Sequence, residues 1–192
     1  SSAGVALGAV RATHHRPWHT VLVSGGDGTR AAYEPALARF LLRAGERAER
    51  IASVCSGSFL LAAVGLLDGK RATTHWSRCD ELARRFPDVR VEPDRIFTRD
   101  GRVWTSAGIT AGIDLALALI GEDLGEAIAK RTAQQLVVYH RRPGGQSQFS
   151  SLLDLSFGRA GSPEGTFAEL LAWAREHLDA DLGVERLARR AA

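Results

Sequence analysis

The stretch IASVCSGSFLLAAVGLL, residues 51–67, decides how this chain folds. Residues 51–54 are apolar or small and predict a short buried strand, whereas Ser56 to Leu67 has the pattern of a helix. Cys55 stands between the two. A strand that passes into a helix through small residues makes a sharp turn, which exposes the side chain of the turn at the carboxyl edge of a sheet. We therefore expect an α/β fold with Cys55 at such an edge.

The same alternation of strand and helix precedes this stretch. Residues 20–23, TVLV, predict a buried strand, and the glycine-rich turn SGGDGT follows it. A helix is expected from Pro35, because proline is tolerated in a first turn, and Gly45 is placed to close it. Strand, helix, strand and helix in succession require crossover connections. We therefore expect a mostly parallel sheet, with helices on both faces.

Beyond residue 67 the chain contains short β-type segments and further helical ones. The β-type segments are residues 71–75, 89–91, 95–98 and 103–105. The turn RDG, residues 99–101, predicts a hairpin between the last two. The helical segments are residues 82–86, 109–120 and 123–140. Since residues 109–120 carry almost no charge, we expect that helix to be deeply buried.

Composition limits the class of protein. Of 192 residues, 45% are hydrophobic and 24% are charged, which is enough to bury a core. The sequence shows neither an apolar run of membrane-spanning length nor a signal-peptide pattern, so we expect a soluble cytoplasmic protein. Cys55 and Cys79 belong to no CxxC pair or Cys/His cluster, which argues against a disulfide framework and a zinc site. We expect no cofactor. The net charge of +3 permits a nucleic-acid partner.

Cys55 has the surroundings of a reactive thiol. Unpaired backbone N–H groups and the positive end of the helix dipole at Ser56 favour a thiolate, and they could also hold an anionic ligand. The alternative is that Cys55 is a small buried hydrophobic residue, as free cysteines often are. The sharp turn favours the first interpretation.

Three motifs resemble a known family. The motif VCSGSFLLAAVGLLDGKRATTHW, residues 54–76, resembles the ThiJ/PfpI branch of the class I glutamine-amidotransferase-like superfamily, in the form found in GlxA-type regulators of the AraC family. The resemblance continues through TSAGITAGIDLALALI, residues 105–120, and RRPGGQSQFS, residues 141–150. It implies a flavodoxin-like ligand-sensing domain followed by a DNA-binding domain with two helix-turn-helix units.

This resemblance suggests a division of the chain. We assign residues 1–140 to the sensing domain, and the resemblance implies that its first strand is missing from this sequence. Residues 141–161, rich in glycine and polar side chains, are expected to form a linker. Residues 162–192 show helical spacing from Phe167 to Leu178 and again from Val184 to Arg190. We expect this last part to be the truncated start of the helix-turn-helix domain.

Two departures from the family pattern bear on catalysis. In hydrolytic relatives a histidine follows the nucleophile directly, whereas here Ser56 follows Cys55. In amidotransferases a later His-x-Glu completes the triad, but residues 106–110 contain neither residue. Hydrolysis by a thiol needs a base within hydrogen-bond reach. His75 is the only substitute that the sequence suggests, although a histidine beside Trp76 can equally serve to pack and to hydrogen-bond.

The expected ligand site lies at the carboxyl edge of the sheet and draws on several turns. Its candidate residues are Gly25, Gly26, Cys55, Ser56, His75, Trp76 and Thr110. The glycines let the backbone approach a ligand and could offer N–H groups to it. Thr110 either faces the site or caps the following helix. Trp76 and Trp104 could provide apolar or cation-binding walls.

Two functional hypotheses follow. The first is a non-enzymatic transcriptional regulator, whose α/β domain senses a small nitrogenous metabolite and whose C-terminal domain binds DNA. The resemblance implies the metabolite class and a homodimer, for which residues 123–140 offer one candidate face. The second is a cysteine-dependent hydrolase or hydratase. Because Ser56 replaces the family histidine and a helical segment follows the linker, the regulator is favoured, with Cys55 as a vestigial nucleophile elbow.

Overall fold

The fold is described from a computed structural model of the chain. The residues described are 18–26, 34–138, 173–179 and 182–191, together with residues 8, 29, 145, 146 and 170. The chain divides into two compact units, residues 1–146 and 147–192, and each is described by itself. No helix within these described ranges is long and apolar enough to cross a bilayer.

The first unit is built on a four-stranded sheet in the order β1-β2-β6-β5. The strands are β1 (Thr20–Val23), β2 (Arg50–Val54), β5 (Phe97–Asp100) and β6 (Val103–Ser106). Strands β1, β2 and β6 run parallel, and β5 runs antiparallel to β6. The predicted hairpin turn is present, with Asp100 opposite Val103 and Gly101 at a φ of +62°. A mostly parallel α/β fold is confirmed.

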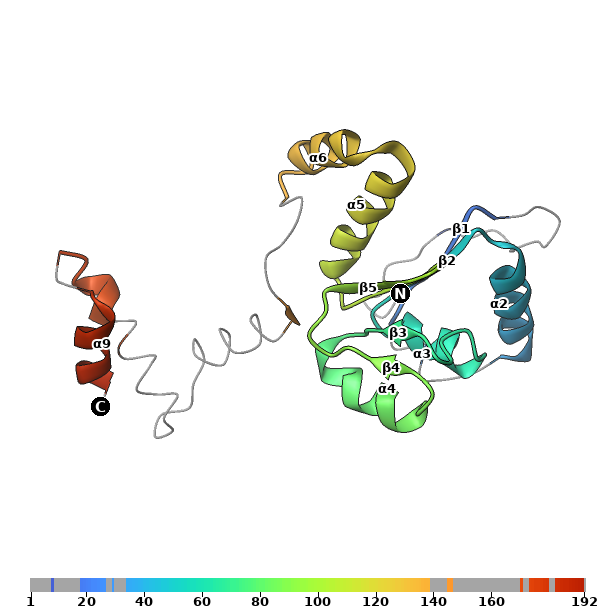
Figure 1. The fold of residues 1–192 in the computed structure, drawn as a ribbon, viewed down its shortest axis with the longest axis horizontal. Helices are drawn as coiled ribbons and strands as arrows, with labels where there is room; N and C mark the ends of the chain where they lie inside the picture. Colours follow the sequence, from blue (N-terminus) through green and yellow to red (C-terminus); the bar gives the residue numbers. More distant parts are fainter. Residues whose placement is uncertain are drawn as a thin grey trace. The chain divides into compact units, whose positions relative to one another are not determined.

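Helices cover both faces of this sheet (Figure 1). The helices are α2 (Pro35–Arg47), α3 (Gly57–Ala63), α4 (Cys79–Arg85), α5 (Ala111–Leu124) and α6 (Glu126–Gln135). Ile51 of β2 belongs to the larger core cluster, which includes side chains of α2, α3 and α4. Ala52, the next residue, packs with Leu115 of α5. Successive side chains of a strand point to opposite faces, so one strand supplies both cores.

Two of the predicted segments are shorter than expected, and a third starts earlier. The strand predicted at residues 71–75 is the two-residue β3 (Arg71–Ala72), which pairs with β4 (Arg90–Val91) in a small second sheet. The helix predicted from Ser56 to Leu67 is α3, which ends at Ala63 and is followed by turns. The helix predicted at residues 82–86 starts earlier, with the 3₁₀ turn Trp76–Arg78 leading into α4.

Gly45 does not close its helix, contrary to the prediction. It lies inside α2, which continues to Arg47. A Cβ at this position would stand 2.6 Å from the Cδ2 atom of Leu66. The glycine therefore allows close packing between α2 and the turn that follows α3.

The helix predicted at residues 109–120 is not deeply buried all round. It forms as α5, with Leu115 and Leu117 buried, whereas Ile109 is 84% exposed and Ile113 is 38% exposed. Ile109 precedes the helix and has a φ of +44°. The prediction of deep burial was wrong because only one face of α5 packs on the sheet.

The helix predicted at residues 123–140 is divided. Gly125, at a φ of +90°, separates the end of α5 from α6, and the two helices pack together. Glycine adopts this conformation without the steric cost that a side chain would bring. Residues 139 and 140 lie outside the described residues.

The second unit contains α9 (Val184–Ala191), which confirms the predicted helix from Val184 to Arg190. The guanidinium of Arg190 lies 4.2 Å from the ring centroid of Trp173, and that ring stacks on His177. Of the helix predicted from Phe167 to Leu178, residues 170 and 173–176 are helical, and Phe167 lies outside the described residues. Residues 147–161 of the predicted linker also lie outside them.

A buried arginine, Arg50, joins the start of β2 to the end of α5. Arg50 is only 7% exposed, and its guanidinium donates to both carboxylate oxygens of Asp123 and to Thr20 Oγ1, the latter at 2.8 Å. The hydrogen bonds from Arg50 lower the pKa of the Asp123 carboxyl. Next to this pair, Arg99 and Glu122 form an exposed bidentate pair at 2.6 and 2.8 Å.

Asp123→Ala is expected to lower the free energy of unfolding by about 2–3 kcal/mol, because it leaves the buried Arg50 guanidinium without its carboxylate. The matched variant Glu122→Ala removes the exposed pair and should cost less than about 1 kcal/mol. Urea denaturation measures both. The folded pKa of Asp123 is depressed, so the stabilisation is present above the unfolded value of about 3.9 and should disappear as the pH falls through the folded pKa. Equal losses in the two variants would contradict this account.

Candidate functional site

Cys55 occupies the tight turn between β2 and α3, where the sequence predicted it. Its φ is +56°, a left-handed conformation that is uncommon for any residue except glycine. The amide of Cys55 donates to the carbonyls of Ser106 at 3.0 Å and Ala107 at 3.2 Å, and its carbonyl accepts from Thr74 Oγ1 at 2.9 Å. The Cys55 side chain is half-buried. Two neighbouring segments therefore hold the backbone of this turn while part of the side chain remains accessible.

The glycine turn after β1 lies directly against Cys55. A Cβ on Gly25 would stand 2.7 Å from the amide nitrogen of Ser56 and 2.9 Å from the Cβ of Cys55, so the approach requires glycine. The amide of Gly26 donates to Ser56 Oγ at 3.0 Å, and Ser56 is buried. This N–H therefore stabilises the turn, whereas the sequence suggested that it could be offered to a ligand.

His75 lies beside the same turn. Its neighbour Thr74 is hydrogen-bonded to Cys55, and the imidazole packs so closely on Gly108 that a Cβ there would collide with the ring. His75 Nδ1 accepts from the amide of Ser77 at 3.3 Å and lies 2.9 Å from Ser77 Oγ. Since Nδ1 accepts a hydrogen bond, the neutral ring carries its proton on Nε2. Among the described residues, no hydrogen bond joins the Cys55 sulfur to His75.

The remaining candidate residues have different positions. Trp76 is 54% exposed, and its ring centroid is 5.5 Å from that of His75. Thr110 is exposed and is the N-cap residue of α5, as the capping alternative predicted, although its side chain makes no capping hydrogen bond. Trp104 is buried, stacks on Phe97 and lines a cavity at the other edge of the sheet, so the prediction that it provides a wall of the ligand site was wrong.

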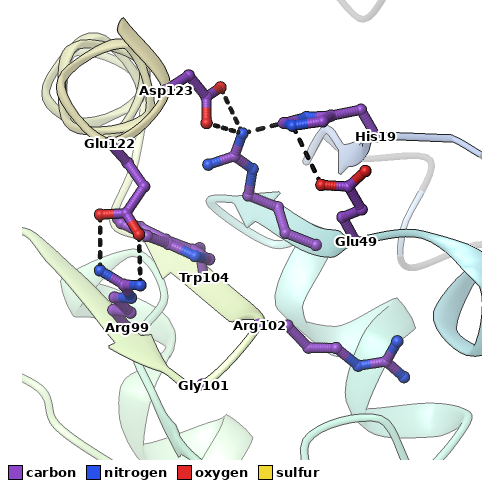
Figure 2. Close-up of a pocket in the computed structure, with 9 residues that line it drawn as sticks. His19, Glu49, Arg99, Gly101, Arg102, Trp104, Glu122 and Asp123 are labelled. Carbon is purple, nitrogen blue, oxygen red and sulfur yellow. Dashed lines mark hydrogen bonds and ion pairs between the residues drawn. The ribbon is translucent and has the colours of Figure 1, made fainter. Parts of the chain in front are cut away.

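A cavity of about 300 Å³ lies at the opposite, amino edge of the parallel strands (Figure 2). Its lining residues are His19, Glu49, Arg50, Arg99, Gly101, Arg102, Trp104, Glu122 and Asp123. Most of the charged groups are already paired with one another, as in Arg50 with Asp123 and Arg99 with Glu122. The cavity is therefore lined by the ion pairs that hold the end of α5, and it is separate from the predicted ligand site. In the part of the chain that the structure describes, no three His, Cys, Asp or Glu side chains gather as metal ligands.

The sequence reasoning missed a layer of buried hydroxyl groups beneath the turn. Thr73 and Thr105 are fully buried, and the amide of Thr73 donates to Thr105 Oγ1 at 2.7 Å. Thr105 Oγ1 also lies 2.8 Å from Thr98 Oγ1. Buried hydroxyls need partners, so these threonines bond mainly to one another and to backbone carbonyls. The signal was present in the pair Thr73–Thr74 directly before His75.

The ring of His75 should titrate below its ordinary value of 6.5, because burial lowers its pKa and the nearby Arg78 adds to the effect. NMR titration of the imidazole measures this pKa, and Arg78→Gln should raise it only in part, since burial is the larger cause. A depressed histidine pKa also means that the protein loses stability as the pH falls from about 6.5 through the folded pKa. A wild-type pKa at or above 6.5 would contradict the prediction.

Comparison with known proteins gives this geometry a family context. Residues 9–122 match the DJ-1/PfpI family. The chain is 36% identical to the HTH-type transcriptional regulator GlxA of Rhizobium meliloti (strain 1021) over 135 residues, which is 69% of this chain and 41% of that protein. It is 42% identical to an isonitrile hydratase of Pseudomonas putida over 119 residues, 60% of this chain and 50% of that protein. The chain thus spans half or less of the length of these relatives.

Solved structures agree on the fold. The crystal structure of an AraC family transcriptional regulator from Pseudomonas putida matches with a TM-score of 0.64 at 24% identity, and the match covers 71% of this chain and 74% of that one. The resemblance to GlxA-type regulators is confirmed by the 36% identity to the Rhizobium meliloti protein. Because the family match includes more than half of the residues, the chain belongs to the DJ-1/PfpI family.

Proposed function

We propose that the first unit senses a small molecule and that the second unit is part of a helix-turn-helix domain, which binds DNA in the full-length protein. The name of the GlxA relative as an HTH-type transcriptional regulator supports this proposal. As the sequence resemblance implies, the effector is a small nitrogenous metabolite. Residues 162–192 are proposed to contribute the start of the DNA-binding domain.

The turn at Cys55 is the observation that carries the sensing role. A cysteine that is partly exposed, on a backbone fixed from two sides, lies at the edge where α/β sheets bind their ligands. We propose that the effector contacts Cys55, His75, Trp76 and Thr110. The remaining site residues, Gly25, Gly26 and Ser56, shape the floor through their close packing and hydrogen bond.

The hydrogen bonds around this turn favour sensing over turnover. His75 Nδ1 already accepts from Ser77, and Ser56 Oγ already accepts from Gly26. These groups fix the shape of the site and are not poised to take a proton from Cys55. A ligand can be recognised by such a rigid surface without any chemical step.

Helix α9 carries charge that suits DNA, although residues 147–192 as a whole contain five arginines against seven acidic residues. Helix α9 carries three arginines, Arg186, Arg189 and Arg190, against the single acid Glu185. Arginines along one helix supply the phosphate contacts that position a DNA-binding domain. We also propose a homodimer, since operators are commonly read by symmetric pairs. The exposed apolar side chains of Leu124, Leu136 and Val137 around α6 support a pairing face there.

The full-length protein is expected to retard a DNA fragment taken from upstream of its own gene. If it makes at least six phosphate contacts, its affinity should fall by about a thousandfold or more between 50 and 200 mM salt. Arg186→Ala should weaken binding, whereas Lys130→Ala in the first unit should not. A scrambled fragment of equal length is the control for sequence preference. Failure to bind any upstream DNA at low salt would exclude the proposed regulator.

Isonitrile hydration is the alternative, and the 42% identity to an isonitrile hydratase favours it. In that reaction water adds to the isonitrile carbon and gives an N-substituted formamide. Cys55 would have to act as the nucleophile, and His75 is the titratable group beside it.

Because we propose a sensor and not a hydratase, incubation of the protein with an aliphatic isonitrile should give no formamide above the uncatalysed rate. Chromatography of the product measures this, and Cys55→Ala is the control. Formamide production by the wild type that disappears in Cys55→Ala would establish the alternative and overturn the assignment as a sensor.

A further inference from the structure

Gln146 is a buried side chain in a stretch that the sequence assigned to a linker. It is only 6% exposed, and its backbone amide donates to the carbonyl of Asp94 at 2.9 Å. The preceding Gly145 packs against Asp94 so closely that a Cβ would collide with it. These two residues therefore lie at a defined place on the first unit.

The side-chain amide of Gln146 lies among four oxygen atoms. The distances from Nε2 are 3.1 Å to Thr73 Oγ1, 3.1 Å to the carbonyl of Thr74, 3.0 Å to the carbonyl of Pro93 and 2.8 Å to the carbonyl of Arg95. A primary amide has only two N–H donors. Two hydrogens thus face four acceptors, and more than one pairing is available to the same side chain.

A short series of hydrogen bonds leads from this amide to the candidate site. Gln146 Nε2 donates to the carbonyl of Thr74, and Thr74 Oγ1 donates to the carbonyl of Cys55 at 2.9 Å. One residue therefore separates Gln146 from the strained turn. The next residue after Thr74 is His75, whose ring packs on Gly108.

We propose that Gln146 is a positioning residue that couples the Cys55 turn to the second unit. The first unit ends at Gln146, so the chain continues toward the second unit from a residue whose side chain is bonded to Thr73 and Thr74. A group bound at Cys55 displaces Thr74, and the Gln146 amide then exchanges that carbonyl for those of Pro93 and Arg95. This inference rests on the proposed function, because a coupling route has a role only if an effector binds at Cys55 and the second unit binds DNA.

The test uses iodoacetamide as a probe that places a small group on Cys55. The thiolate sulfur displaces iodide and gains a carboxamidomethyl group, and mass spectrometry verifies that Cys55 and not the buried Cys79 is modified. Hydrogen exchange of the full-length protein is then followed in peptides that cover residues 145–146 and 147–192. In the wild type, modification should change these exchange rates by roughly two- to tenfold, the effect of one hydrogen bond.

Three variants separate coupling from a purely structural anchor. Gln146→Ala should show altered exchange before modification and no further response to it. Thr74→Val breaks the bond to the Cys55 carbonyl but keeps the carbonyl that Gln146 uses, so protection at residue 146 should persist while the response is lost. Gln135→Ala replaces an exposed glutamine and should respond as the wild type does.

Two outcomes would overturn the coupling role: a wild type whose exchange ignores the modification, or a Thr74→Val variant that responds as strongly as the wild type. Should Gln146→Ala fail to fold, Thr74→Val alone decides. The readout contains no DNA and no effector. Failure of the coupling role can therefore be distinguished from failure of the proposed function, which the DNA retardation experiment tests.

Discussion

The backbone of Cys55 is the constraint on which the first unit depends. A residue with a side chain in this left-handed conformation costs about 1–3 kcal/mol, so the surroundings must over-determine it. They do so from three directions. Strand β6 and the residue after it accept from the Cys55 amide, Thr74 donates to its carbonyl, and Gly25 packs against its Cβ. The contacts from β6 and from Gly25 come from the carboxyl ends of strands in the main parallel sheet, whereas Thr74 follows β3 of the small second sheet.

The hydroxyl groups beneath this turn explain how a polar site can rest on a hydrophobic core. Thr73, Thr98 and Thr105 are buried on the sheet, and bonding among themselves offsets their loss of water. The side-chain amide of Gln146, the last residue of the first unit, donates to Thr73 Oγ1 and so joins the same network. Such a hydrogen-bond network fixes the positions of its side chains more strictly than apolar packing does, because every donor needs an aligned acceptor.

The carboxyl and amino edges of the parallel strands differ in whether their side chains are already paired. Helix α5 begins beside Thr110 at the Cys55 edge, and its 14 residues, about 21 Å long, end at Leu124, next to Asp123, at the other edge. There the buried Arg50 and the exposed Arg99 bind its last turn. The cavity at that edge is lined by charges that already satisfy each other, whereas the Cys55 edge keeps accessible side chains. This difference in pairing, rather than cavity size, is why the functional proposal rests on the Cys55 edge.

Local pattern determined much of this protein. The strands around residues 20–23 and 51–54, the turn at Cys55 and the hairpin at residues 99–101 follow from apolar runs and turn residues, which act over a few positions. Only the tertiary structure decided the contacts that depend on distant segments. Gly45 makes room for Leu66, Trp104 lies with Arg50, and Gln146 is buried beside Thr73. Nothing in the sequence near Gln146 indicates burial, because its four acceptors come from residues more than fifty positions away along the chain.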